Sequence, residues 1–145
     1  MRMIRKLLFA GMILVIASCV SRKPIDGPRP VLKDDNTFRL AGVSKDSTYG
    51  FTPENPVLVG GIQIRQGPWN EERYLNALAG PKGEAVTYVK AGSCCPIEGE
   101  NGLLKNALLD TFRVYWVGAP DSVSLYLNMY EEGELKAPVG FTVKK

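Results

Sequence analysis

Apolar and polar residues alternate most regularly in the last third of the chain. Every second residue is apolar over residues 112–116 and again over residues 123–129. A period of two gives a strand one buried face and one wetter face. Residues 119–121, with the sequence Ala-Pro-Asp, are typical of a turn, so we predict an antiparallel pair of strands. A second turn at residues 131–134 and a final strand at residues 139–143 complete this part of the chain.

Two further strands and one helix are predicted upstream. Residues 57–65 and 84–91 are rich in β-branched side chains, and the paired glycines of the first run indicate a bulge or bend. Between these runs, Asn70 is a suitable helix N-cap, acidic residues follow it, and Gly80 with Pro81 ends a helix. The apolar stripe of this helix consists of three residues, Tyr74, Leu75 and Leu78.

These elements predict a small α+β fold, in which an antiparallel sheet of roughly four to six strands carries one short helix. An all-β sandwich or an open barrel is the alternative. The polar residues 45–56 are rich in turn-forming types and predict an ordered loop. Residues 92–102 predict a second loop, which carries two adjacent cysteines.

The first residues have the pattern of a lipoprotein signal peptide. Arg2, Arg5 and Lys6 precede an uncharged run that ends at residue 20, shorter than the roughly 20 apolar residues of a transmembrane helix. Its end, Ile-Ala-Ser-Cys, resembles the lipobox of bacterial lipoproteins. We therefore expect cleavage after residue 18 and a lipid anchor of palmitate-like acyl chains on Cys19. An ordinary secreted protein with a chance cysteine at the cleavage site is the alternative.

No acidic residue directly follows Cys19, so we expect the anchor to lie in the outer membrane, facing the periplasm. Residues 19–36 contain three prolines and predict an extended tether, with a first edge strand as the alternative. Residues 37–145 are long enough to form a single globular domain.

Removal of the leader changes the apparent charge of the protein. The full chain has 18 basic and 15 acidic side chains, and the first 18 residues hold three of the basic and none of the acidic ones. The mature chain therefore carries 15 of each and has no basic stripe for nucleic acid. Histidine is absent, which excludes Ser-His-Asp and Cys-His catalysis and zinc sites built on histidine. No cofactor is expected.

Cys94, Cys95 and Pro96 form the most conspicuous chemical motif. If Cys19 is lipidated, these two cysteines hold the remaining thiols in an oxidising compartment. Adjacent Cα atoms lie about 3.8 Å apart, closer than the roughly 4.4–6.8 Å of ordinary disulfides, so a bond between them would be strained and reducible. Four interpretations remain open: a structural disulfide, two free thiols, pairing with a partner protein or a soft metal, and a redox catalyst.

Two groups of polar side chains are further candidates for function. Tyr126, Asn128 and Tyr130 fall on one face of a predicted strand and form a candidate binding face, with an ordinary wet sheet face as the alternative. Glu71 and Glu72 are neighbours on the predicted helix. Their side chains therefore diverge by about 100° and cannot flank one scissile bond.

Five strings of residues are distinctive in the mature chain. They are K-D-S-T-Y-G-F-T-P-E-N-P at 45–56, N-A-L at 76–78, G-S-C-C-P at 92–96, N-M-Y at 128–130 and L-K-A-P-V-G-F at 135–141. Together they resemble a family of small lipoproteins from Bacteroidetes-type bacteria. Some members bear the name 2-dehydro-3-deoxyphosphooctonate aldolase, an enzyme that folds as a (β/α)₈ barrel of about 250 residues. This chain is too short for that barrel, so the resemblance implies a lipoprotein rather than the aldolase activity.

The leading hypothesis is a non-catalytic envelope lipoprotein, a binding or assembly module that meets an envelope protein through its sheet face or cysteine loop. The alternative is a thiol-dependent enzyme or redox-sensitive factor that uses Cys94 and Cys95. In both cases the membrane is an expected partner through the lipid on Cys19, and neither nucleic acid nor a metal is expected.

Overall fold

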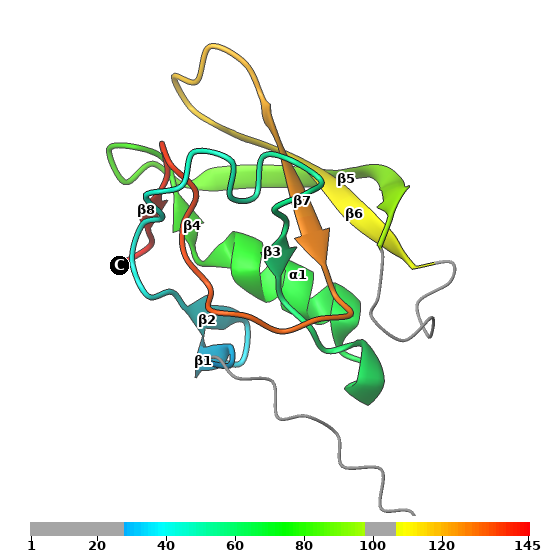
Figure 1. The fold of residues 1–145 in the computed structure, drawn as a ribbon. Coiled ribbons are helices and arrows are strands. Elements are labelled where there is room, and N and C mark those ends of the chain that lie inside the picture. Colours follow the sequence, from blue (N-terminus) through cyan, green and yellow to red (C-terminus); the bar gives the residue numbers. More distant parts are fainter. Residues whose placement is uncertain (1–27, 98–106) are drawn as a thin grey trace, which may run out of the picture.

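A computed structural model describes residues 28–97 and 107–145 and shows a mostly β fold (Figure 1). Its largest sheet has four strands in the order β3–β7–β6–β5, and one short helix, α1 (Gly67–Asn76), lies across one face. These strands are β3 (Val57–Leu58), β5 (Val86–Pro96), β6 (Leu108–Trp116) and β7 (Val123–Asn128). The arrangement confirms the predicted α+β class, with β structure predominating.

The sheet is mixed rather than wholly antiparallel. The predicted pair of strands near the end of the chain is confirmed, because β6 and β7 are antiparallel and Phe112 lies opposite Leu125. β5 is also antiparallel to β6, whereas the short β3 runs parallel to β7. Two small sheets complete the fold, namely β1 (Val31–Asp34) with β2 (Thr37–Arg39), and β4 (Leu78–Ala79) with β8 (Thr142–Val143).

The hydrophobic core lies between the main sheet and α1. Alternate residues of β6 and β7 are buried and pack in one cluster with two buried residues of the helix. Full burial of each such side chain contributes roughly 1.5–3 kcal/mol, so this layer dominates the stability of the fold. Its central members are Phe112, Val114, Leu125, Leu127, Tyr74 and Leu75.

The predicted strand at residues 57–65 is a strand only at its start. Gly60 and Gly61 have φ values of 63° and 98°, in the left-handed region, and they turn the chain into a 3₁₀ helix, η1 (Ile62–Ile64). The bend at the glycines is therefore sharper than the predicted bulge and ends β3 at Leu58. A side chain at Gly61 would collide with the amide group of Asn70, so this approach requires glycine.

The helix begins earlier than predicted. It starts at Gly67, and Pro68 occupies its first turn, where the missing backbone donor is not needed. Asn70 is buried inside the helix, and its Nδ2 atom donates to the carbonyl oxygens of Val59 and Gly60 at 3.1 and 3.2 Å. The N-cap prediction was wrong because this side chain satisfies the backbone at the end of the preceding strand.

The end of α1 and the end of the chain meet in the second small sheet. The helix ends at Asn76, so Leu78, predicted to be helical, lies in β4 and pairs with β8. The predicted final strand at residues 139–143 is reduced to β8 because Gly140, with a φ of 92°, interrupts it. Phe141 is nevertheless buried and packs edge-on against Trp116, with ring centroids 5.2 Å apart.

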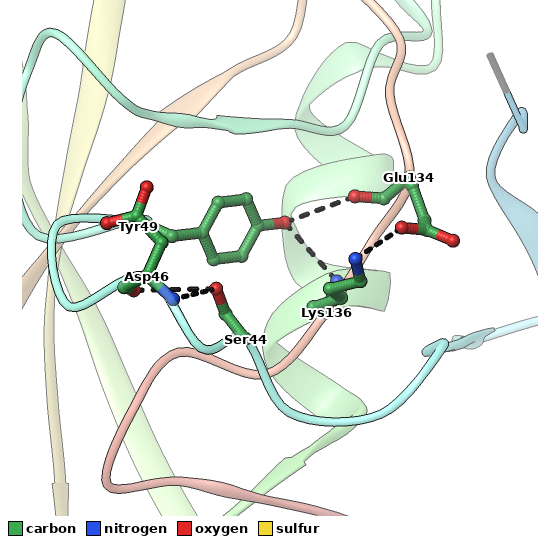
Figure 2. Close-up of polar contacts among 5 residues, drawn as sticks. All are labelled: Ser44, Asp46, Tyr49, Glu134 and Lys136. Atoms are coloured by element: carbon green, nitrogen blue, oxygen red, sulfur yellow. Dashed lines mark hydrogen bonds and ion pairs between the residues drawn. The ribbon is translucent and has the colours of Figure 1, made fainter.

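Residues 45–56 form the ordered loop that the sequence predicts. The Oδ1 atom of Asp46 accepts from the backbone N and the Oγ1 of Thr48, and its Oδ2 accepts from Asn55 at 2.9 Å. The bonds from Thr48 lower the pKa of the Asp46 carboxyl. The Tyr49 hydroxyl donates to the carbonyl of Glu134 at 3.4 Å and accepts from the backbone N of residue 136 at 3.3 Å (Figure 2). These contacts fix the loop against the segment that follows β7.

The N-terminal hairpin begins within the segment that the sequence assigns to a tether. Strand β1 starts at Val31, so the alternative of a first edge strand describes the end of residues 19–36. The Oδ1 of Asp34 accepts from the backbone N of Asn36 at 2.9 Å, which makes the turn, and Arg73 of α1 donates to the carbonyl of Asp35 at 2.8 Å. The expected lipid site, Cys19, lies outside the described residues.

Candidate functional site

The two adjacent cysteines lie in a strand rather than in the predicted loop. Gly92 to Pro96 continue β5 and pair with β6, and Cys94 lies opposite Leu109. The register shifts between Cys94 and Pro96, because Cys95 is an extra residue on the β5 side. The bulge changes the direction of the strand at the position of the cysteine pair.

The sulfur atoms of Cys94 and Cys95 are joined in a disulfide, and the Cα atoms are 3.8 Å apart. The backbone of Cys95 has a φ of 59°, and this left-handed conformation costs roughly 1–2 kcal/mol in a residue other than glycine. The Sγ of Cys94 lies 3.5 Å from the Oγ1 of Thr111 on β6. The disulfide thus belongs to the sheet itself and presents Cys95 at its bulge.

A cavity of about 450 Å³ opens beside this bulge. Three chain segments that are far apart in the sequence line it: the ordered loop, the end of β5 with the start of β6, and the end of β7 with its following turn. Six of the lining residues are apolar, if the disulfide-bonded Cys95 is counted with them, and three are polar. The first set is Pro53, Pro56, Cys95, Pro96, Ile97 and Leu109, and the second is Glu54, Asn128 and Glu131.

Asn128 fixes the polar wall of the cavity. Its side chain is buried, and its Nδ2 donates to the Oε2 of Glu131 at 3.0 Å. Its Oδ1 accepts from the backbone N of Tyr130 at 2.8 Å and of Glu131 at 3.1 Å. The carbonyl oxygen and one N–H of this amide group therefore have partners within the protein, and the amide holds the Glu131 carboxylate in place.

The residues of the predicted binding face, Tyr126, Asn128 and Tyr130, do not all lie in one strand. Strand β7 ends at Asn128, so Tyr130 lies in the following turn. The backbone N of Tyr126 donates to the carbonyl of Gly50 at 2.8 Å, which docks the ordered loop against the edge of β7. Of the three, only Asn128 lines the cavity. Sequence reasoning missed the neighbouring carboxylate of Glu131, whose position depends on the turn.

A second group of polar side chains lies on the opposite face of the sheet. Asp110 is buried on β6, and its Oδ2 pairs with the Nζ of Lys90 at 2.5 Å, while its Oδ1 accepts from the hydroxyl of Ser93. Glu71 of α1 is also buried, and its Oε1 has no hydrogen-bond partner among the described residues. Burial, together with the negative charge of Asp110, raises the pKa of Glu71 to about 8.

The positions of Glu71 and Asp110 in the sequence indicate that both acids are buried. Asp110 has the same parity as the buried Phe112 and Val114, and Glu71 precedes the buried Tyr74 and Leu75 by one helical turn. The side chains of the two neighbouring glutamates diverge as predicted, because Glu71 is buried and Glu72 is exposed. Because alternation separates Asp110 from the cavity residue Leu109, these acids face away from any ligand in the cavity.

No group of three or more metal-ligating side chains is found in residues 28–97 and 107–145. In the same part of the chain, no helix combines the length and apolar character needed to cross a bilayer. Comparisons with protein-family models, curated proteins and solved structures give no match.

Proposed function

We propose that this chain is a non-catalytic envelope lipoprotein that acts as a binding module. Lipid on Cys19 would hold it at the periplasmic face of the outer membrane, and the domain would bind its ligand in the cavity beside Cys95. One observation carries the proposal, namely a cavity of about 450 Å³ lined by six mainly apolar residues and three polar ones, of which Asn128 and Glu131 are hydrogen-bonded to each other. This volume lies within the range of small-molecule sites, which span roughly 300–1,000 Å³.

Three features of the cavity support binding rather than catalysis. Cys95 is bonded to Cys94, so its sulfur is not a free nucleophile. The Glu131 carboxylate accepts a hydrogen bond from Asn128. None of the residues that line the cavity carries a free hydroxyl, amine or thiol group that this carboxylate could activate as a nucleophile. The acid whose pKa is strongly raised, Glu71, lies on the other face of the sheet.

A fragment screen tests the proposal directly. The mature lipidated chain, labelled with ¹⁵N and solubilised in detergent, is titrated with neutral, anionic and cationic fragments. We expect the largest amide shifts at Cys95, Ile97 and Leu109. An Ile97→Trp variant fills the cavity and should abolish them. Val117→Trp is the matched control because Val117 is 90% exposed and lies outside the cavity lining. Shifts that survive Ile97→Trp, or none at all, would contradict the proposal.

The redox alternative is supported by one specific observation, the position of Cys95 in the cavity wall. A redox factor requires both sulfur atoms, whereas a binding module requires only the shape of the bulge. A Cys94→Ser/Cys95→Ser variant should therefore restore function to a deletion strain under the leading proposal. Failure to do so, with fragment binding and melting temperature retained, would favour the redox factor. Thr111→Val, which removes only the contact to Cys94, is the control.

A further inference from the structure

Two large apolar side chains are exposed where η1 leads into α1. Ile64 is the last residue of η1 and is 65% exposed, and Trp69 lies in the first turn of α1 and is 61% exposed. Because η1 contacts α1, both side chains belong to the same end of the helix. A tryptophan ring buries roughly 150–250 Å² when it finds a partner, so its exposure here leaves a large apolar surface in water.

The hairpin of β1 and β2 lies on the same side of α1 as Trp69. Residues four apart share one face of a helix, so Trp69 and Arg73 point to the same side. Arg73 donates to the carbonyl of Asp35 in the hairpin turn at 2.8 Å, and Asn76, one turn further on, donates to the carbonyl of Asn36 at 3.0 Å. In Figure 1 the hairpin and η1 accordingly lie near opposite ends of α1, both on the lower side of the molecule.

The first strand of the hairpin adds two exposed apolar side chains. All four residues of β1 are exposed, among them Val31 and Leu32. Leu32 lies opposite Phe38 of β2, which is buried in the hydrophobic core, so the hairpin is held by its second strand and open at its first. We call Val31, Leu32, Ile64 and Trp69 together the apolar patch. Exposed apolar residues that gather in this way mark interaction sites more often than single ones do.

The apolar patch lies where the domain joins its expected anchor. The described residues begin at Pro28, three positions before β1 and nine positions after Cys19. A chain spans at most about 3.3–3.6 Å per residue, so lipid on Cys19 would keep the start of the hairpin within roughly 30 Å of the bilayer surface. A surface held at this range meets the bilayer at a high effective concentration, and even a weak contact is then sufficient for docking. The membrane is therefore the partner that this part of the domain meets first.

The charges around the patch are nearly balanced. Within residues 28–39 and 61–76, four exposed basic side chains stand beside three exposed acidic ones. A difference of one charge gives little attraction to anionic headgroups. Tryptophan, in contrast, is favoured at the membrane interface because its ring is apolar and its N–H group is polar. The patch therefore suits the boundary between water and acyl chains. The basic residues are Arg29, Lys33, Arg39 and Arg65, and the acidic residues are Asp34, Asp35 and Glu72.

We propose that the apolar patch docks the domain on the bilayer that holds its lipid anchor, with Trp69 and Ile64 inserted at the level of the headgroups. This inference rests on the proposed lipid on Cys19 and goes beyond the binding function, because it assigns a surface and an orientation to the domain. Docking adds a second point of contact to the lipid. The domain then presents one fixed side to the periplasm.

The test measures the fluorescence of Trp69 in the mature lipidated chain, reconstituted into vesicles of phosphatidylcholine. A Trp116→Phe variant leaves Trp69 as the only tryptophan, because the sequence holds two. Its emission should lie at shorter wavelength than that of the unlipidated Cys19→Ser chain in buffer. It should lose about half its intensity when the acyl chains are brominated near the headgroup, since interfacial side chains lie about 5–10 Å into this boundary. Trp69→Phe, which leaves the partly buried Trp116, is the control and should be quenched little.

Two matched variants separate the patch from other exposed apolar residues. With Trp69 as the only tryptophan, Val31→Glu/Ile64→Glu places two charges in the patch and should abolish quenching by the brominated lipid. Val89→Glu/Val117→Glu makes the same change at two exposed valines outside the patch and should leave quenching unchanged. Unchanged melting temperatures would show that both variants are folded. Since the contact is apolar, neither a higher salt concentration nor added phosphatidylglycerol should change the quenching.

Flotation of the vesicles reports on the anchor independently of the patch. If the chain floats with the vesicles and Trp69 is not quenched, docking is overturned and the proposed lipoprotein stands. Quenching that persists in Val31→Glu/Ile64→Glu, or that requires phosphatidylglycerol, also overturns docking through the apolar patch. Shielding of Trp69 from a water-soluble quencher in native envelopes but not in vesicles would assign the patch to a protein partner instead. If the chain does not float, the lipoprotein and the docking fail together.

Discussion

At the scale of single residues, Glu71 has an unusual environment for an acid, because it is buried and its Oε1 has no hydrogen-bond partner among the described residues. It is buried beside the negative Asp110, and its pKa is raised to about 8, first by burial and then by that charge. In an unfolded chain the same group ionises near 4.5. Between these values the folded chain holds a proton that the unfolded chain has released. The free energy of unfolding therefore falls as the pH rises from about 4.5 to about 8.

A Glu71→Gln variant should remove this dependence. Glutamine is neutral at every pH and has nearly the shape of protonated glutamic acid. The free energy of unfolding of the variant, minus that of the unmodified protein, should rise with the pH. We expect this difference to be about 2–4 kcal/mol larger at pH 9 than at pH 5. Urea unfolding at the two pH values measures the difference. Glu72→Gln, at the exposed neighbouring position, should show no such trend, and a pH-independent effect of Glu71→Gln would contradict the raised pKa.

At the scale of elements, strand β5 connects the cavity with the polar side chains around the buried Asp110. Its Ser93 hydroxyl donates to the buried Asp110 on one face of the sheet, and Cys95, two residues later, lines the cavity on the other. The bulge at Cys95 makes this change of face compatible with pairing to β6. The disulfide is therefore a structural part of the cavity wall.

Alkylation of native protein tests the state of this strand. Without reductant, the mature lipidated chain should take up no alkylating label, because Cys94 and Cys95 are bonded to each other and Cys19 carries lipid. After reduction under denaturing conditions it should take up two labels per chain. Intact mass spectrometry counts the labels. Two labels on the native, unreduced protein would show free thiols and would remove the disulfide from the account.

The elements also show which features a local pattern can predict. The period of two identifies β6 and β7 because their pairing is local and one face is buried. The paired glycines indicate a bend, but its size depends on contact with Asn70 from the later helix. The role of Asn70 itself could not be predicted, since its partners belong to another element. Local pattern therefore predicts strands better than it predicts the junctions between them.

At the scale of the whole molecule, the cavity joins segments that the sequence separates. Residues 45–56, 92–96 and 128–130 each attract attention in the sequence, and each contributes to the same cavity. Their convergence requires the docking of the ordered loop on β7, through Tyr126 and Gly50, which no local pattern encodes. The cysteine pair could be singled out from the sequence, whereas the place of Glu54 and Glu131 in the cavity lining could not, because it depends on this convergence.

The expected anchor makes a prediction at the same scale. A Cys19→Ser variant cannot be lipidated, so it should move from the membrane fraction to the soluble periplasmic fraction. Metabolic labelling with a palmitate analogue should mark the unmodified protein only. Cys94→Ser keeps the anchor and is the control. An unmodified protein found wholly in the soluble fraction would contradict the proposed lipoprotein.

The proposed function places a bound small ligand in the cavity beside Cys95. Intermolecular nuclear Overhauser effects between the protein and the fragment that causes the largest amide shifts locate that ligand. We expect cross-peaks to Leu109, Ile97 and the ring of Pro96. Cross-peaks instead to Ile64 and Trp69, which are apolar, 65% and 61% exposed and outside the cavity, would contradict it.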